Sequence, residues 1–556
     1  MRRLIIFIAF LLIAVNFVYT QTWQLVYKNK GVGTKDTVLA QLGVGRSVLV
    51  ADVNKDGVKE IYTTAYVGHK VIQFTVAGND SVELTYIFPD QPSAFYSEPR
   101  DVEVGDLDGD GKLEIIYPVG RTKADFTNHV NQRGYQVWEW NPSTNRFDGP
   151  YVIIPDTNMA RFRPENFVID DVDGDGKQEL VHFEFAFNGT DDGVYIISIE
   201  GDFESGFATV NVEGVFKTGP RNMAVSSGIV ADVDGDGKKE IWFMGNNITG
   251  NETPLWFIKV KGPNTYVADT NKVVILQSAN SYPLKAIARG DFDNDGKDEV
   301  YFPFFRAKTV DENIPNTIYV IGNLNNVDDF DSTKIKVIFS DTTDKMLYLY
   351  NLQNVGNKYL LLGGYYVVYE AEYRGVGSPL DPNSWTFTKL IDYNPVDSAA
   401  GAGWSGGIWR TGARNDLDGD GKPEIILFLQ GISDSLNKYS ENKVLRIYEK
   451  TVTGVKEWTV ITPDDYELYQ NYPNPFNPTT NISFYLPVDK KISLIIYDAS
   501  GREVVRLIDD QEFPKGKHTI IWDGKDKYGK PVASGTYFYK LKFGSFEKTR
   551  KMMLIK

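Results

Sequence analysis

The chain has 556 residues, no cysteine and a formal net charge of −15 at pH 7. Its length is enough for two or more domains with cores of their own. The absence of cysteine excludes disulfides, thiolate chemistry and lipid attachment through a cysteine, and the negative charge argues against nucleic-acid binding. An aromatic content of 13%, mainly tyrosine and phenylalanine, favours β-strands.

Residues 1–20 have the pattern of a secretory signal peptide. Arg2 and Arg3 form the positive end, and the apolar run from Leu4 to about Val18 is too short for a comfortable membrane span. We expect cleavage after Thr20; the alternative is an N-terminal anchor helix. Because no other stretch is apolar enough to cross a bilayer, we expect an exported protein with no membrane span after the signal is removed.

Six short acidic loops dominate the mature chain. Each has oxygen-bearing side chains at positions 1, 3, 5 and 9, and a glycine at position 6 that allows a tight turn with positive φ. A hard cation such as calcium binds about six to eight oxygens, which short carboxylates on a turning backbone supply, and position 7 adds a backbone carbonyl. The predicted metal ligands, loop by loop, are Asp52, Asn54, Asp56, Val58 and Glu60; Asp106, Asp108, Asp110, Lys112 and Glu114; Asp171, Asp173, Asp175, Lys177 and Glu179; Asp232, Asp234, Asp236, Lys238 and Glu240; Asp291, Asp293, Asp295, Lys297 and Glu299; and Asp416, Asp418, Asp420, Lys422 and Glu424.

The loops therefore predict about six bound calcium ions, which would bring the net charge near neutrality. Without metal, each cluster of carboxylates should repel itself. An EF-hand is the competing explanation, but it requires flanking helices and an acid at position 12. None of the six loops has an acid at position 12, which rejects the EF-hand; the residues there are Thr63, Tyr117, His182, Phe243, Phe302 and Leu427.

The loops recur at a regular spacing. Their first positions are 54, 65, 61, 59 and 125 residues apart, so one copy is missing near residue 353. Residues 351–362 keep the glycine, Gly356, and the apolar run that follows it, but they have no acid. We interpret them as a structural repeat that does not bind metal. Alternatively, Tyr365, Tyr366 and Trp385 nearby could form a binding surface.

Each repeat is predicted to hold four strands and no helix. Seven such repeats predict a seven-bladed β-propeller, with eight blades or an open arrangement as alternatives. An extra strand at 23–27 could complete the last blade. Runs before the loops lie at 47–50, 102–104, 167–169 and 228–230, and runs after them at 60–62, 114–117, 240–244, 299–302 and 424–429. The second hairpins lie at 71–76 and 82–88, 136–140 and 151–154, 194–199 and 208–212, 255–260 and 272–276, 317–321 and 334–339, 366–369 and 386–391, and 444–448 and 457–461.

These repeats resemble the FG-GAP/VCBS repeats of integrin-alpha-like propellers, which carry calcium loops of the pattern D-x-D-x-D-G-x-x-D. The resemblance covers about residues 22–461, within a predicted propeller domain of residues 21–461. It implies that the metal stiffens the blades and does no chemistry. The chain departs from the pattern at position 9, where glutamate replaces aspartate and lengthens that ligand by one methylene.

The composition changes after residue 461. Residues 462–475 form a predicted proline-rich linker, and the segment from Tyr472 to Pro478 cannot be a helix or a central strand. Alternating apolar residues resume at 482–486, 492–496, 518–522 and 537–541, separated by glycine-containing turns. They predict a small, antiparallel, Ig-like β-sandwich.

Residues 466–556 resemble the C-terminal sorting domain of type IX secretion substrates. The matching stretches are 471–480 (NYPNPFNPTT), 522–524 (WDG), 532–537 (VASGTY) and the basic tail 548–556. The resemblance implies the type IX secretion machinery as a partner, export through the periplasm, and delivery to the medium or the outer cell surface. The alternative is an Ig-like module without a targeting role.

No catalytic residue is predicted. The G-x-S-x-G match at 403–407 lacks the strand–turn–helix setting of a nucleophile elbow. The four histidines, His69, His129, His182 and His518, are not spaced as metal ligands. We therefore expect a binding or adhesion protein for a surface glycan or protein. The alternative is a secreted polysaccharide-active hydrolase or lyase with its site in the propeller funnel.

Overall fold

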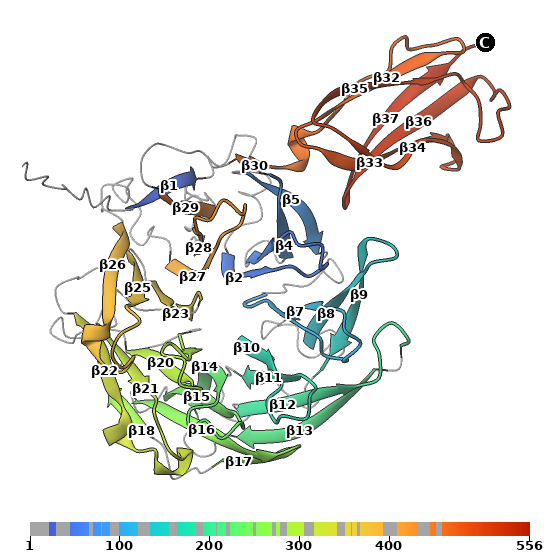
Figure 1. Cartoon of the computed structure of the whole chain (residues 1–556). Coiled ribbons are helices and arrows are strands. Elements are labelled where there is room, and N and C mark those ends of the chain that lie inside the picture. Colours follow the sequence, from blue (N-terminus) through green and yellow to red (C-terminus); the bar gives the residue numbers. More distant parts are fainter. Residues whose placement is uncertain are drawn as a thin grey trace, which may run out of the picture.

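The computed structural model shows an all-β chain (Figure 1). It describes residues 22–28, 45–65, 70–78, 81–88, 99–119, 134–154, 162, 164–184, 193–206, 208–217, 223–247, 252–268, 274–278, 286–304, 316–341, 351–356, 358–363, 367–392, 408–430, 445–451 and 459–556. Within these ranges no helix has the length and apolar character needed to cross a bilayer. The helical turns are η4 (Val327–Asp329), η5 (Ser332–Lys334), η6 (Pro382–Ser384) and η8 (Pro463–Asp465). The predicted signal peptide and its cleavage position lie outside the described residues.

Before residue 462 the described strands form seven sheets, which Figure 1 shows around a common centre. The first sheet contains β2 (Gly45–Ala51), β3 (Glu60–Ala65), β4 (Lys70–Val76) and β5 (Ser81–Phe88), and the second contains β6 (Glu103–Gly105), β7 (Glu114–Val119), β8 (Gly134–Asn141) and β9 (Arg146–Ile153). The third sheet contains β10 (Pro164–Asp170), β11 (Glu179–Glu184), β12 (Gly193–Glu200) and β13 (Thr209–Lys217). The fourth sheet contains β14 (Met223–Ala231), β15 (Glu240–Asn247), β16 (Glu252–Gly262), β17 (Thr265–Ala268) and β18 (Val274–Ser278). The fifth holds β19 (Ala288–Gly290), β20 (Glu299–Phe304), β21 (Asn316–Ile321) and β22 (Lys336–Asp341), the sixth β23 (Asn351–Asn354), β24 (Tyr359–Gly363), β25 (Val367–Tyr373) and β26 (Trp385–Asp392), and the seventh β27 (Ile408–Asn415), β28 (Glu424–Gln430), β29 (Leu445–Thr451) and β1 (Thr22–Lys28).

Apolar side chains pack between consecutive sheets. The middle strands are buried on both faces, as in β11, where every residue is buried, including its two glutamates and His182. Separate clusters join each sheet to the next. A further cluster joins the first sheet to the seventh and contains Ile61, Phe74, Ile426 and Ile447. Burying each such side chain contributes about 1.5–3 kcal/mol, so the junctions hold the sheets together.

The first and last strands of this region each pair with a sheet from the opposite end of the chain segment. The predicted strand at 23–27 is confirmed: β1 pairs antiparallel with β29. The strand predicted at 457–461 does not complete the seventh sheet, because β1 already occupies that edge. Instead β30 (Thr459–Ile461) pairs parallel with β5 of the first sheet. The predicted strand at 272–276 overlaps β18, which pairs antiparallel with β16 as predicted, while the additional strand β17 pairs with the remaining part of β16.

The C-terminal region is a two-sheet sandwich. One sheet contains β31 (Glu467–Leu468), β32 (Thr480–Leu486) and β35 (Gly516–Trp522), and the other β34 (Glu503–Phe513), β33 (Lys490–Asp498), β36 (Gly535–Phe543) and β37 (Phe546–Leu554). The predicted alternation is confirmed in β32, where Ile482, Phe484 and Leu486 are buried and their neighbours less so. They pack with Trp522 and Tyr539 in one core. The strand β37 was missed because its sequence is dominated by charged residues.

The sandwich contacts the first sheet through a buried acid. Glu83 on β5 is 4% exposed. One of its oxygens lies 2.8 Å from Nζ of Lys490, and the other accepts a hydrogen bond from the Tyr466 hydroxyl. Phe546 of the sandwich packs against the cluster between the first and seventh sheets. The two regions therefore share a partly buried, polar and apolar interface.

Candidate metal centres

Each acidic loop connects the first and second strands of its sheet and is closed by the aspartate at position 1. One oxygen of this carboxylate accepts a hydrogen bond from the backbone N–H of the position-6 glycine, at 2.9–3.1 Å in all six loops. These glycines have φ between +81° and +91°, which other residues rarely adopt. At position 5, the aspartate accepts a hydrogen bond of 2.7–2.9 Å from the N–H of position 7. These two hydrogen bonds are thus the same in all six loops.

The glutamate at position 9 is buried beneath each loop. One of its oxygens accepts a hydrogen bond from the N–H of position 2, at 2.7–3.4 Å. The other oxygen is buried without a hydrogen-bond partner in Glu60, Glu114, Glu299 and Glu424, as is one oxygen each of Asp106 and Asp293. A buried polar atom without a partner is costly, and a bound cation would remove that cost. The donor set therefore fits a hard divalent ion.

Burial also changes the proton affinity of these glutamates. It raises the pKa of Glu60, Glu179, Glu240 and Glu424 to about 8, and that of Glu114 and Glu299 to about 9. The neighbouring loop aspartates add to the rise because they are negatively charged. Without a cation, the glutamates therefore keep a proton at neutral pH.

Five of the six loops bring three or more carboxylates together, with ligand atoms within 4.8 Å of one another, in the part of the chain that the structure describes. The groups are Asp106, Asp108, Asp110 and Glu114; Asp171, Asp173 and Glu179; Asp232, Asp234 and Asp236; Asp291, Asp293 and Asp295; and Asp416, Asp418 and Glu424. Asp175, Glu240, Glu299 and Asp420 lie outside these groups. The first loop forms no such group, and its Asn54 donates to Asp56 at 3.0 Å instead.

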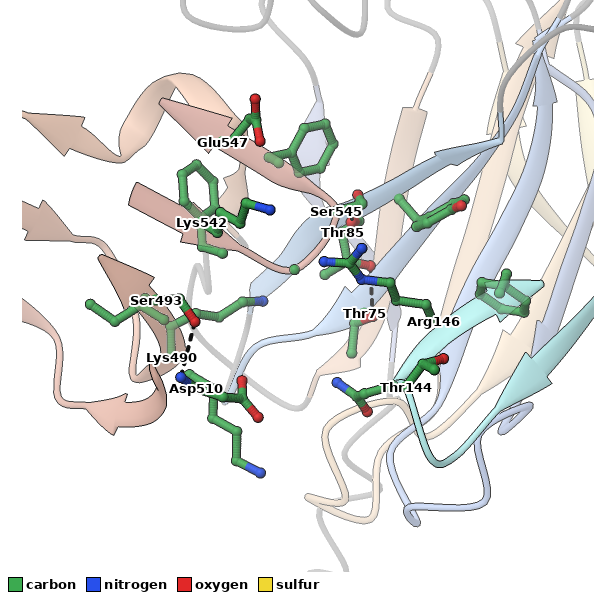
Figure 2. Close-up of a pocket in the computed structure, with 18 of the residues that line it drawn as sticks. Thr75, Thr85, Thr144, Arg146, Lys490, Ser493, Asp510, Lys542, Ser545 and Glu547 are labelled. Carbon is green, nitrogen blue, oxygen red and sulfur yellow. Dashed lines mark hydrogen bonds between the residues drawn. The ribbon is translucent and has the colours of Figure 1, made fainter. Parts of the chain in front are cut away.

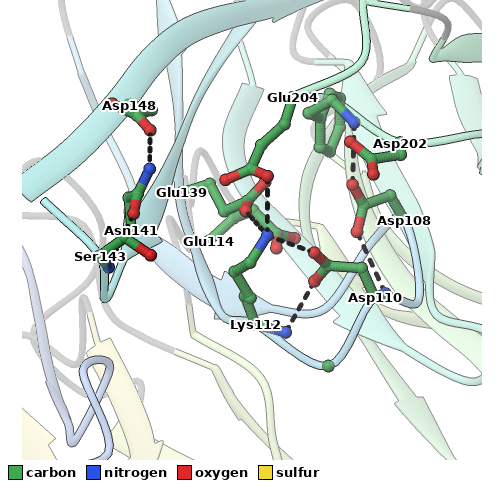
Figure 3. A network of polar contacts seen from close by, with 12 residues as sticks. Asp108, Asp110, Lys112, Glu114, Glu139, Asn141, Ser143, Asp148, Asp202 and Glu204 are labelled. Atoms are coloured by element: carbon green, nitrogen blue, oxygen red, sulfur yellow. Dashed lines mark hydrogen bonds and ion pairs between the residues drawn. The ribbon is translucent and has the colours of Figure 1, made fainter.

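The second loop has a lysine and further acids beside its carboxylates (Figure 3). Nζ of Lys112, at position 7, lies 2.5 Å from Asp110, 2.5 Å from Glu139 and 3.2 Å from Glu204. Glu139 is fully buried and pairs across the strands with Glu114. Burial raises the pKa of Glu139 to about 7, although the hydrogen bond from Lys112 opposes the rise.

The loop of the seventh sheet, at residues 416–424, has the same arrangement. Nζ of Lys422 lies 2.8 Å from Asp420 and 3.4 Å from Glu449, which is buried opposite Glu424. The sequence interpretation missed Glu139 and Glu449, because both lie on the third strand, outside the loop pattern. An alignment of the repeats with one another would have shown a glutamate at this strand position in these two copies.

The sixth repeat keeps the fold without the acids. Its strands β23 and β24 pair as in the other sheets, and Asn354 donates to the carbonyl of Arg289 at 2.6 Å. Trp385 is 3% exposed and packs in the core between the fifth and sixth sheets, so it does not form the binding surface considered above. Tyr365 and Tyr366 lie outside the described residues.

The sequence features considered for catalysis do not form a site among the described residues. His182 is fully buried between the Tyr135 hydroxyl, at 2.8 Å, and Glu184, at 3.0 Å. His518 contacts the carbonyl of Pro514. The segment 403–407 with its serine, His69 and His129 lie outside the described residues.

A polar cleft of about 810 Å³ separates the sandwich from the first two sheets (Figure 2). Lys542 lies on the sandwich side, and Arg146 and Thr144 lie on the side of the sheets. The hydroxyls of Thr75 and Thr85 on the same side are 2.9 Å apart. The sequence could not indicate this cleft, because its walls come from two regions far apart in the chain.

Comparison with known proteins gives a family match only for the sandwich. The profile of the FlgD Ig-like domain matches residues 473–544, so the C-terminal region is Ig-like. No curated protein matches the chain. The crystal structure of FlgD from P. aeruginosa is 30% identical over 14% of this chain and 58% of that one, with a TM-score of 0.12.

Two further solved structures align with most of the chain. PorZ, an essential bacterial surface component of the type IX secretion system of Porphyromonas gingivalis, is 11% identical over 92% of this chain, with a TM-score of 0.31. The aligned region covers 66% of PorZ. The Dos1 propeller is 10% identical over 80% of this chain and 98% of its own length, with a TM-score of 0.39.

Proposed function

We propose that the chain is an exported, calcium-binding, seven-bladed β-propeller that acts as a binding or adhesion protein for a glycan or protein at the cell surface. The observation that carries the metal assignment is the buried carboxylate oxygen left without a partner beneath the repeated acidic loops. Seven units of four or five strands, with apolar clusters at every junction, support the propeller. Calcium would neutralise the loops and fix the turn between the first two strands of each blade. The catalytic alternative gains no support from the described residues.

We further propose that residues 462–475 link the propeller to a sorting domain at 466–556 that directs type IX secretion. The support is the residue pattern of the sandwich, and its compact Ig-like fold is consistent with a separate module. Residues 1–20 would direct the preceding step into the periplasm. The chain would then be released or remain at the outer surface.

The mature chain should bind about six calcium ions, because six loops share the ligand pattern and the hydrogen bonds that close the turn. Elemental analysis after dialysis against calcium measures this number. Asp234→Ala combined with Asp236→Ala should remove one ion, while the matched surface change Asp331→Ala should remove none, since Asp331 only caps a helical turn. An unchanged ion content in the double variant would show that the loop is not a metal site.

Deleting residues 462–556 should stop the protein in the periplasm, because the signal for the second export step would be lost. Cell fractionation and immunoblotting measure the distribution. The Asp234→Ala, Asp236→Ala variant is the control, since a damaged metal loop should still be exported. Surface delivery of the truncated chain at the wild-type level would contradict a sorting role.

A further inference from the structure

In three loops, the aspartate at position 3 bridges its own loop and the next sheet. One oxygen of Asp108, Asp173 and Asp234 accepts the N–H of position 5 in its own loop, at 3.2–3.3 Å. The other oxygen accepts a backbone N–H from the following sheet, in the connection between its third and fourth strands. These donors are Phe203 at 3.0 Å (Figure 3), Asn264 at 2.6 Å and Val327 at 2.7 Å.

A second set of contacts links the bases of neighbouring loops in the same direction. Position 8 of one loop contacts position 1 of the loop before it: Gln178 accepts the N–H of Asp106 at 2.7 Å, and Asp298 accepts that of Asp232 at 3.0 Å. The N–H of Asp298 returns to the Asp232 carbonyl at 2.7 Å. Lys59, at position 8 of the first loop, donates to the Asp416 carbonyl of the seventh at 3.2 Å.

From these contacts we infer that the second, third and fourth loops each depend on the following sheet to position their position-3 aspartate. An ion bound in one of these loops therefore orders the connection between the third and fourth strands of the next sheet. The inference rests on the proposed calcium binding. The backbone N–H holds the position-3 carboxylate in place before the ion arrives. Coupling of this kind is reciprocal: if the turn favours ion binding, ion binding stabilises the turn to the same degree.

The third and fourth loops allow a matched test. Asp175 and Asp236 occupy position 5, and each accepts an N–H from its own loop only, at 2.8 and 2.9 Å. Hydrogen exchange would be followed by mass spectrometry on the full mature chain, with and without calcium. The peptides to follow contain Asn264, in the fourth sheet, and Val327, in the fifth.

In the wild type, calcium should slow exchange of both peptides about tenfold, as expected for a hydrogen bond to a charged acceptor. Asp175→Ala should abolish this protection at Asn264 and leave it at Val327. Asp236→Ala should do the reverse. Each variant should lose one ion by elemental analysis of the same sample, and its effect should appear one sheet further along the chain.

Three outcomes would overturn the inference. If Asp236→Ala removes protection at Asn264 and Asp175→Ala does not, each loop acts on its own sheet. If both variants affect both peptides equally, calcium controls the ring as a whole. If the wild type binds calcium but neither peptide responds, the contacts do not couple the sites. A chain that binds no calcium at all would instead refute the proposed function on which the inference rests.

Tyr266 provides a test without removing a metal ligand. Its hydroxyl lies 3.2 Å from the same oxygen of Asp173 and 2.6 Å from Glu213. Tyr266→Phe should raise the calcium concentration for half-maximal protection at Asn264 about fivefold, since one hydrogen bond is lost. The value at Val327 should not change. An equal rise at both peptides would indicate general loosening and would contradict a positioning role for Tyr266.

Discussion

Calcium removal should destabilise the chain by a large amount, and more at pH 9 than at pH 5.5. With free calcium at about ten times the Kd, six sites would contribute about 8 kcal/mol, on the order of 10 °C in Tm. The pH dependence comes from the position-9 glutamates, whose pKa burial raises from 4.5 to about 8 or 9 in the metal-free fold.

The sign follows from proton binding. Between pH 4.5 and about 8–9, the glutamates of the unfolded chain have lost their protons, whereas those of the metal-free fold retain them. The stability of the metal-free fold is therefore greatest at low pH and falls as the pH rises through this window. Calcium instead favours the ionised glutamates and competes with the protons. The difference in Tm between the calcium-loaded and the metal-free protein should therefore increase from pH 5.5 to pH 9.

Scanning calorimetry with and without calcium across this pH range measures the effect. Titration calorimetry in buffers of different ionisation enthalpy should also show close to one proton released per ion at pH 6.5. Glu240→Gln, which cannot ionise, should reduce the release by about one proton per chain. Binding without proton release at pH 6.5 would show that the glutamates are already ionised in the metal-free protein.

Glu83→Ala should separate the sandwich from the first sheet. It would leave the Lys490 ammonium and the Tyr466 hydroxyl without their acceptor in a partly buried interface. Removing one partner of a buried ion pair costs about 3–5 kcal/mol. We expect two separate calorimetric transitions and a larger radius of gyration by X-ray scattering.

The control is the exposed pair of Lys540 and Glu547 on the sandwich, 2.7 Å apart. Glu547→Ala should change stability by less than about 1 kcal/mol, because exposed ion pairs contribute little. Combining Glu83→Leu with Lys490→Met and Tyr466→Phe should restore docking, since neither a charge nor a hydroxyl is left without its partner. If Glu83→Ala retains the wild-type radius of gyration, the remaining contacts hold the sandwich in place, among them Phe546 and the hydrogen bond from the Ser545 hydroxyl to the Thr85 carbonyl.

The sequence predicted the features that depend on neighbouring residues. The turn at each position-6 glycine and the alternation of Ile482, Phe484 and Leu486 follow from local backbone preferences and strand periodicity. The β-strand content follows for the same reason, because each repeat carries its own apolar runs. The shared ligand pattern also repeats often enough to be recognised without any knowledge of the fold.

The missed features involve partners from distant parts of the chain. Glu139 approaches the second loop because β7 and β8 pair in one particular register, and Glu204 reaches Lys112 from the next sheet. The pairing of β30 with β5 depends on which edge β1 has already covered. Trp385 was considered as a surface residue because sequence alone does not show which face the fifth sheet covers.

The position of β1 has a consequence for the timing of folding. Thr22 pairs with Thr451, so the first strand to leave the ribosome belongs to the sheet that is completed last. Closing so long a stretch of chain costs entropy before any contact compensates it, and folding dominated by such distant pairings is slow. A chain still being synthesised would therefore keep β1 unpaired until the residues up to Thr451 have been made. This topology favours assembly of the seventh sheet only after the six sheets between its two ends have been synthesised.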